Sequence, residues 1–114
     1  MPKRDPDLLV EDMLEALRKI ELYTAGMDHS SFLQDEKTID AVVRNLEVLG
    51  EAARQVPDDF VAGHRSVPWE KITGLRNRIV HNYFGLDLEI IWQIIRNDLV
   101  HSKLSWKNWH EHSG

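Results

Sequence analysis

The chain has 114 residues, no cysteine and a formal net charge of −5. This length supports one hydrophobic core, so we expect a single domain over residues 1–114. The lack of cysteine excludes disulfides, thiolate zinc sites and cysteine nucleophiles, and suits a reducing cytoplasm. No apolar run reaches the length of a membrane span and the N-terminus has no signal-peptide core, so we expect a soluble, cytoplasmic protein with no membrane partner.

The charge is unevenly distributed along the chain. Residues 1–63 contain seven Lys/Arg and fourteen Asp/Glu, whereas residues 64–114 contain seven and five. The acidic total argues against a general nucleic-acid binder. A local basic site on an acidic body still attracts a phosphate chain, because the field near a cleft depends on the nearby charges.

The first apolar pattern predicts a helix that begins at Pro6. Asp5 supplies a capping oxygen, and proline is favoured at the first helical position. Apolar residues then recur at three- and four-residue spacing until the chain reaches Gly26. These apolar residues are Leu9, Met13, Leu17 and Ile20.

A second, longer helix is predicted from about Lys37 to the residue before Pro57. Residues 31–34 resemble a capping box ahead of it, and apolar residues then recur at helical spacing. The stripe consists of Ile39, Val42, Val43, Leu46, Leu49, Ala53 and Val56.

The second half of the chain predicts two further helices. Residues 57–67 mix turn formers with apolar residues, which indicates a connector with one short helical turn. Pro68 opens a third helix that ends near Gly85, Asp87 caps a fourth, and the tail 106–112 is expected to fray. No segment alternates with period two. We therefore expect an all-α fold, an antiparallel up-and-down four-helix bundle with room for a short fifth helix.

One dense polar cluster interrupts this pattern, and it holds Arg76, Asn77, His81 and Tyr83. On a regular helix Asn77 and His81 lie one turn apart, but Arg76 and His81 point roughly 140° apart around the axis. Two explanations stay open. Either the helix distorts near Asn82, or a second copy of the chain supplies the complementary group across a twofold axis.

The same cluster resembles the signature of the HepT-like family of the HEPN superfamily. That signature is an arginine, four residues, a histidine, one residue and a tyrosine, and it is complete at Arg76, His81 and Tyr83. The resemblance covers most of the chain and includes the flanking stretches Val67-Pro68-Trp69 and Trp92-Gln93-Ile94-Ile95. It implies a helical bundle that forms a homodimer and acts as a metal-independent ribonuclease without a cofactor.

The resemblance also implies a partner. Proteins of this family typically act as the toxin of a type VII-like toxin–antitoxin pair, beside a minimal nucleotidyltransferase antitoxin that transfers AMP to the motif tyrosine, here Tyr83. The alternative is a non-catalytic subunit that binds a nucleotide or a substrate and docks to a nucleotidyltransferase.

The residue chemistry fits RNA cleavage. His81 has an ordinary pKa near ~6.5 and is suited to proton transfer, and Arg76 offers a permanent fork of donors to phosphate, so these two are the catalytic candidates. Asn77 and Tyr83 are supporting candidates. Glu51 follows Gly50 inside an apolar stripe, and we expect a buried carboxylate that either supports the site or pairs with Arg76.

The remaining histidines do not form a metal site. His29, His64, His101, His110 and His112 lack partners at ligand spacing, so no metal is expected. Trp69 and Trp92 are expected to anchor the core or an interface, and Gly50 to permit close helix packing.

Overall fold

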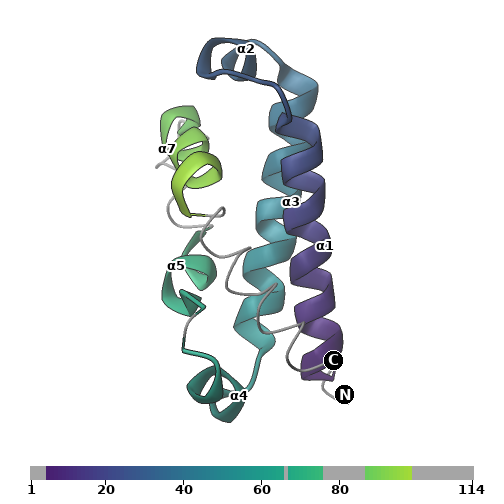
Figure 1. Cartoon of the computed structure of the whole chain (residues 1–114), viewed down its shortest axis with the longest axis vertical. Coiled ribbons are helices and arrows are strands. Elements are labelled where there is room, and N and C mark those ends of the chain that lie inside the picture. Colours follow the sequence, from purple (N-terminus) through teal and green to yellow (C-terminus); the bar gives the residue numbers. More distant parts are fainter. Residues whose placement is uncertain (1–4, 66, 76–86, 99–114) are drawn as a thin grey trace.

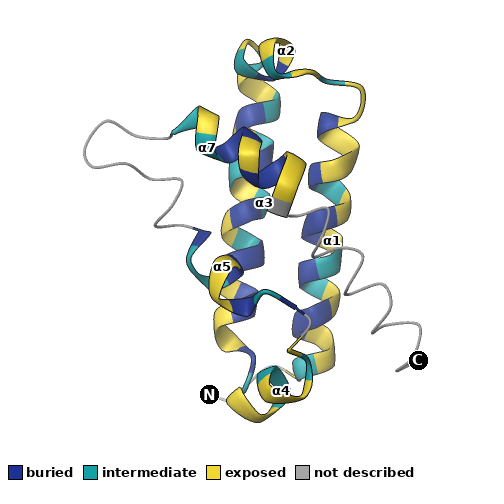
Figure 2. Cartoon of the chain, turned by 60° about the vertical axis from the view of Figure 1, so that its left-hand side comes forward, coloured by how far each residue is buried: buried dark blue, intermediate teal, exposed yellow. Residues whose placement is uncertain are grey.

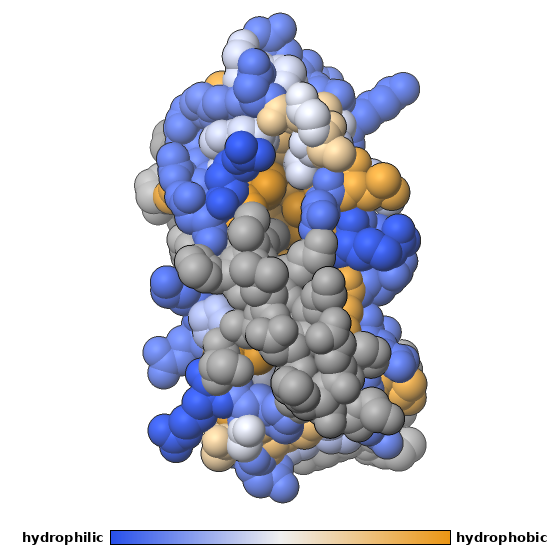
Figure 3. All heavy atoms as spheres, in the orientation of Figure 1, coloured by the Kyte–Doolittle hydropathy of each residue, from blue (hydrophilic) through white to orange (hydrophobic). Residues whose placement is uncertain are grey.

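All regular structure in the described residues is helical, which confirms the predicted all-α class. The structure is a computed structural model that describes residues 5–65, 67–75 and 87–98. No strand occurs within these three ranges. None of the helices within them combines the length and the apolar character needed to cross a membrane. On the face seen in Figure 3, most of the described residues at the surface are hydrophilic.

Two long antiparallel helices form the frame of the molecule, α1 (Pro6–Thr24) and α3 (Glu36–Gln55) (Figure 1). Asp5 caps α1, as predicted, by accepting a hydrogen bond from the Asp7 backbone N–H at 2.8 Å. Asp35 caps α3 in the same way, with the Thr38 N–H at 3.0 Å. These caps satisfy N–H groups that have no partner inside the helix, so both predicted long helices are confirmed at their starts as well as along their apolar stripes.

A short helix, α2 (His29–Leu33), connects the two long ones and corrects one prediction. Ser31 belongs to a capping box at the start of this short helix and does not prepare the start of α3. The Asp28 carboxylate accepts from the Ser31 N–H at 2.8 Å, and the Ser31 hydroxyl accepts from the Asp28 N–H at 3.0 Å. The hydrogen bond from the Ser31 backbone lowers the pKa of Asp28.

The connector after α3 contains the predicted helical turn, α4 (Asp58–Gly63). Pro68 then precedes α5 (Trp69–Thr73), and Asp87 caps α7 (Leu88–Gln93) through the Ile90 N–H at 3.1 Å, both as predicted. A π-helical turn labelled η1 (Ile94–Asp98) continues α7.

The helices α5 and α7 lie on the same side of α3 (Figure 1). The described helices therefore agree with a helical bundle. The rest of the predicted third helix, the end of the fourth, and the tail 106–112 lie outside the described residues, so the full four-helix topology stays a prediction.

The core fills the space between the α1–α3 pair and the α5–α7 side (Figure 2). Trp69 and Trp92 are each only 8% exposed, which confirms them as core anchors. Phe32 on α2 lies 5.2 Å from Trp92, ring centroid to ring centroid, and so ties α2 to α7. The side chains with essentially no exposure are Leu9, Met13, Ile20, Phe32, Val42, Leu46, Leu49, Leu75, Ile91 and Ile94.

Gly50 brings α3 close to α5. A Cβ atom at this position would lie 3.3 Å from the backbone carbonyl oxygen of Ile72, tighter than an ordinary carbon–oxygen contact. The predicted role of Gly50 in close helix packing is confirmed. Because Ile72 is itself buried, its backbone has little freedom to retreat.

We predict that Gly50→Ala destabilises the protein. Alanine gains roughly 0.5–1 kcal/mol of helix propensity over glycine, but overpacking a core contact typically costs about 1–3 kcal/mol. The expected net loss in the free energy of unfolding is about 1 kcal/mol, measured by urea denaturation. Gly63→Ala is the matched control, because a Cβ at Gly63 meets no atom within 4 Å and the substitution should be neutral or stabilising. Equal effects of the two substitutions would show that the Gly50–Ile72 approach is not tight.

We also predict that the Asp28 cap loses its advantage in acid. A carboxylate whose pKa is lower in the folded than in the unfolded state stabilises the fold above its unfolded pKa, and this contribution disappears as the pH falls through the folded value. Asp28→Asn keeps a capping oxygen but removes the titration. Urea denaturation should show the wild type more stable than Asp28→Asn at neutral pH and the gap closing in acid. A gap that is independent of pH would contradict the prediction.

Candidate functional site

The predicted catalytic motif joins two anchored parts of the fold. Arg76, Asn77, His81 and Tyr83 lie outside the described residues, so the predictions about their geometry stay predictions. The structure describes the residue directly before the motif, Leu75, and the described chain resumes at Asp87. The environment of these two positions shows how the bundle holds the ends of the motif segment.

The entry to the motif is fixed in the core. Leu75 is 1% exposed and directly precedes Arg76. Trp69, at the start of α5, is buried, and its indole N–H donates a hydrogen bond to the backbone carbonyl of His64 at 2.9 Å. Together with the close approach of Gly50 to α5, these contacts fix the chain immediately before the catalytic candidates.

The exit from the motif is fixed by a cap and an aromatic cluster. Asp87 starts α7, whose Ile91 and Trp92 are buried. The Trp92 ring contacts Phe32 and also His29, whose ring centroid lies 6.0 Å away. The Nε2 atom of His29 is shielded from solvent and lies 2.9 Å from the Glu89 carboxylate, without the alignment of a hydrogen bond. Two elements far apart in sequence, α2 and α7, therefore hold each other in place.

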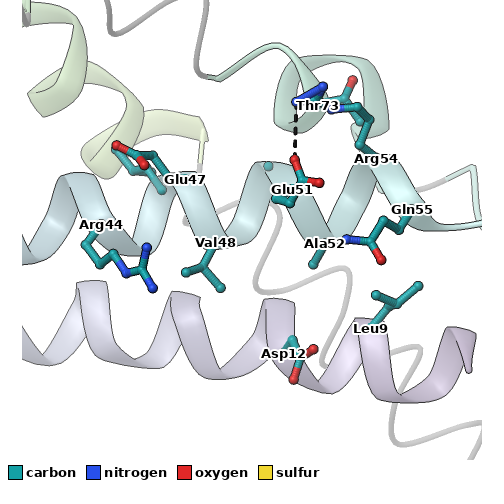
Figure 4. A pocket seen from close by; sticks show the side chains of 12 residues that line it. Leu9, Asp12, Arg44, Glu47, Val48, Glu51, Ala52, Arg54, Gln55 and Thr73 are labelled. Atoms are coloured by element: carbon teal, nitrogen blue, oxygen red, sulfur yellow. Dashed lines mark ion pairs between the residues drawn. The ribbon is translucent and has the colours of Figure 1, made fainter. Parts of the chain in front are cut away.

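Glu51 does not have the buried position that we predicted. Its side chain is 61% exposed and forms an ion pair with Arg54 at 3.3 Å, one helical turn further along α3 (Figure 4). An exposed pair of this kind contributes little to stability. A direct role for Glu51 at the motif stays untested, because Arg76 lies outside the described residues.

Glu51 and Arg54 line a shallow groove of about 420 Å³ that crosses α3 (Figure 4). Its rim reaches Thr73, which precedes the motif by only a few residues. Both carboxylates and guanidinium groups line the groove, so it does not form a purely basic site for phosphate. Its lining includes Leu9 and Asp12 from α1, Arg44 and Glu47 from α3, and Thr73.

The histidines in the described ranges have structural contacts. The Nδ1 atom of His64 lies 2.8 Å from the Phe60 carbonyl oxygen, and its ring stacks on the Phe60 ring at 4.2 Å. His29 contacts Glu89 and Trp92, as described above. Within the described ranges, no three His, Cys, Asp or Glu side chains are grouped so that they could hold a metal ion.

The sequence analysis missed one exposed cation on the helical segment that follows the motif in the chain. The guanidinium carbon of Arg96 lies 5.3 Å from the centroid of the Trp92 ring, a cation–π contact. The four-residue spacing of Trp92 and Arg96 on a predicted helix was the available signal, because residues at this spacing are neighbours on one face.

Comparisons with known proteins identify the family. The model of the family described as "Ribonuclease HepT-like" matches residues 13–104, which include the whole motif. The "Putative RNase MJ0127" of Methanocaldococcus jannaschii is 43% identical over 97 residues, covering 85% of this chain and 80% of that protein. The "Probable ribonuclease HepT" of Thermococcus cleftensis is 37% identical over 97 residues, covering 85% of this chain and 88% of that protein.

A bacterial relative shows a similar match. The "Putative RNase TTE0752" of Caldanaerobacter subterraneus is 32% identical over 96 residues, covering 84% of this chain and 86% of that protein. No solved structure matches the chain significantly. The family model and these relatives each cover most of the chain, and the matched region contains the predicted motif. The chain therefore belongs to the HepT-like ribonuclease family of the HEPN superfamily.

Proposed function

We propose that this ribonuclease cleaves RNA without a metal ion, through Arg76 and His81, and acts as a toxin that a nucleotidyltransferase neutralises by modifying Tyr83. The observation that carries the proposal is the complete Arg-x4-His-x-Tyr motif inside the region that matches the ribonuclease family. The homodimer implied by the resemblance is part of the same proposal.

The proposed reaction needs only groups that the substrate and the motif supply. The 2′-hydroxyl oxygen of RNA attacks the adjacent phosphorus and loses its proton, while the bond to the 5′-oxygen breaks and that oxygen gains a proton. The products are a 2′,3′-cyclic phosphate and a 5′-hydroxyl. His81 is assigned to proton transfer, and Arg76 to the negative charge that accumulates on the phosphorane oxygens.

The supporting roles follow from the same chemistry. Asn77 lies one helical turn before His81 on a regular helix, so its amide is assigned to orienting the imidazole or to holding the phosphate. Tyr83 is assigned to a contact with the phosphate or a base. DNA lacks the 2′-hydroxyl nucleophile and should not be cleaved.

The charge distribution supports a small, local RNA site. The excess of acidic residues lies in positions 1–63, which contribute the α1–α3 frame, whereas positions 64–114 have a basic excess and include the motif. A polyanion is repelled by an acidic surface and attracted to a local basic one. This distribution favours approach of RNA from the side of the chain that carries the motif.

The catalytic assignment predicts large losses from single substitutions. His81→Ala and Arg76→Ala should each lower the cleavage rate of a single-stranded RNA by about 100-fold or more, the usual size of an acid–base or charge-stabilisation effect. EDTA should leave the wild-type rate unchanged. Far-UV circular dichroism checks that each variant is folded. Near-wild-type cleavage by either variant, or loss of activity with EDTA, would exclude the mechanism, and absence of cleavage by the wild type would favour the docking-subunit alternative.

The regulatory assignment predicts one covalent modification. The Tyr83 hydroxyl oxygen would attack the α-phosphorus of ATP on the nucleotidyltransferase, release pyrophosphate and add about 329 Da, placing bulk and negative charge beside Arg76 and His81. Intact mass spectrometry after co-expression with the neighbouring nucleotidyltransferase should show this addition and its loss in Tyr83→Phe.

Tyr23→Phe is the matched control for the modification. Tyr23 is the other tyrosine of the chain and is 38% exposed on α1, so it is available to a modifying enzyme but lies outside the motif. Tyr23→Phe should be modified like the wild type. An adduct that persists in Tyr83→Phe but disappears in Tyr23→Phe would place the modification on Tyr23 and contradict the proposal.

A further inference from the structure

Arg96 lies on the first element that follows the motif. It belongs to η1, the π-helical continuation of α7, and α7 begins directly after the segment that contains the motif. Because α5 and α7 lie on the same side of α3, the chain enters and leaves the motif segment on one side of the bundle (Figure 1). Arg96 is therefore on the side of the frame to which the motif is tethered at both ends.

The guanidinium of Arg96 contacts an aromatic ring and has no carboxylate partner among the described side chains. Its carbon lies 5.3 Å from the centroid of the Trp92 ring, a cation–π contact. The N–H donors of a guanidinium form a planar fork, and contact with a neutral ring does not cancel the charge that attracts an anion. Trp92 is itself buried against Phe32, so the platform below the arginine is fixed.

Arg18 and Arg54, which lie on α1 and α3, differ in this respect. Arg18 is bound by Glu15 through two hydrogen bonds of 2.7 and 3.0 Å, and Arg54 is paired with Glu51. Among the side chains described in residues 5–65, 67–75 and 87–97, no carboxylate forms an ion pair with Arg96. The Glu89 carboxylate on α7 lies 2.9 Å from the Nε2 atom of His29.

Two residues with neutral amide side chains, Gln93 and Asn97, are close to Arg96 in sequence. The π-helical turn buries Ile94 and Ile95 and leaves Arg96 and Asn97 exposed. The Asn97 amide donates to the Gln93 side-chain oxygen at 2.7 Å, which leaves the Gln93 amide nitrogen free to donate outward. Single π-helical turns are rare and are frequent at functional sites.

We propose that Arg96, supported by Gln93, binds a backbone phosphate of the RNA substrate. Phosphate oxygens match the planar fork of a guanidinium, and the contact with Trp92 lowers the entropy lost when the arginine is immobilised. The contact reads no base, so it contributes affinity and position and carries no sequence specificity. This inference rests on the proposed ribonuclease function.

The test measures binding separately from cleavage. The probe is a fluorescent single-stranded RNA with 2′-O-methyl riboses, which cannot be cleaved by the proposed mechanism, and fluorescence anisotropy gives Kd at several salt concentrations. Arg96→Gln should weaken binding about tenfold, the usual order for loss of a charge-assisted hydrogen bond. It should also reduce the slope of log Kd against log salt by about 0.7, the value for one phosphate of a single strand. Arg96→Lys should lie between the two proteins, because it keeps the charge but loses the fork and the stacking.

Arg18→Gln is the matched control, because it removes one exposed positive charge from a helix on which that charge is already paired with Glu15. It should bind like the wild type. Equal Kd values and salt slopes for Arg96→Gln and Arg18→Gln would overturn the inference, as would unchanged RNA binding together with loss of binding to the nucleotidyltransferase. Wild-type protein that binds the probe but does not cleave natural RNA would remove the ribonuclease proposal and leave the Arg96 result standing. Absence of probe binding by the wild type would remove both.

Discussion

The close packing of α3 against both α1 and α5 is the constraint on which the rest of the structure depends. Val42, Leu46 and Leu49 on α3 have no exposed surface, and Gly50 lets the α5 backbone approach to where a Cβ atom would make a tight contact. Because protein interiors are packed as densely as organic crystals, a shift of α5 by the size of a methyl group would disturb this contact. The position of Leu75, and hence the start of the motif, therefore depends on a glycine on another helix.

The two ends of the motif are held by different kinds of interaction. Burial of Leu75 fixes the entry, whereas a helix cap at Asp87 and the aromatic contact between Phe32 and Trp92 fix the exit. An acid–base mechanism needs its groups within hydrogen-bond reach of the phosphate, so small displacements of either end are costly for catalysis. Much of the bundle, including the short helix α2, has a role in placing residues that lie far from it in sequence.

The sequence predicted the long helices well because capping oxygens and apolar periodicity agree there. The sequence assigned the capping box that contains Ser31 to the start of α3. Two capping patterns overlap within a few residues there, and only the hydrogen bond between Asp28 and Ser31 shows that this box starts α2. Glu51 was assigned to the core from its neighbours, although it belongs to a polar stripe with Arg54 on the outer face of α3. The contact of Arg96 with Trp92 could be identified only in the structure, because a surface arginine has many rotamers and the sequence does not select one.

The arginines of this chain show how one residue type acquires different functions on one scaffold. The hydrogen bond from Arg18 lowers the pKa of Glu15, as expected for two opposite charges that form an ion pair. Such a pair presents almost no net charge to an approaching polyanion, because the field of each partner cancels at a distance. An arginine stacked on an aromatic ring keeps its full charge, since the ring is neutral. On an acidic chain, the placement of cations without a carboxylate partner therefore has more influence on where a polyanion can approach than the net charge does.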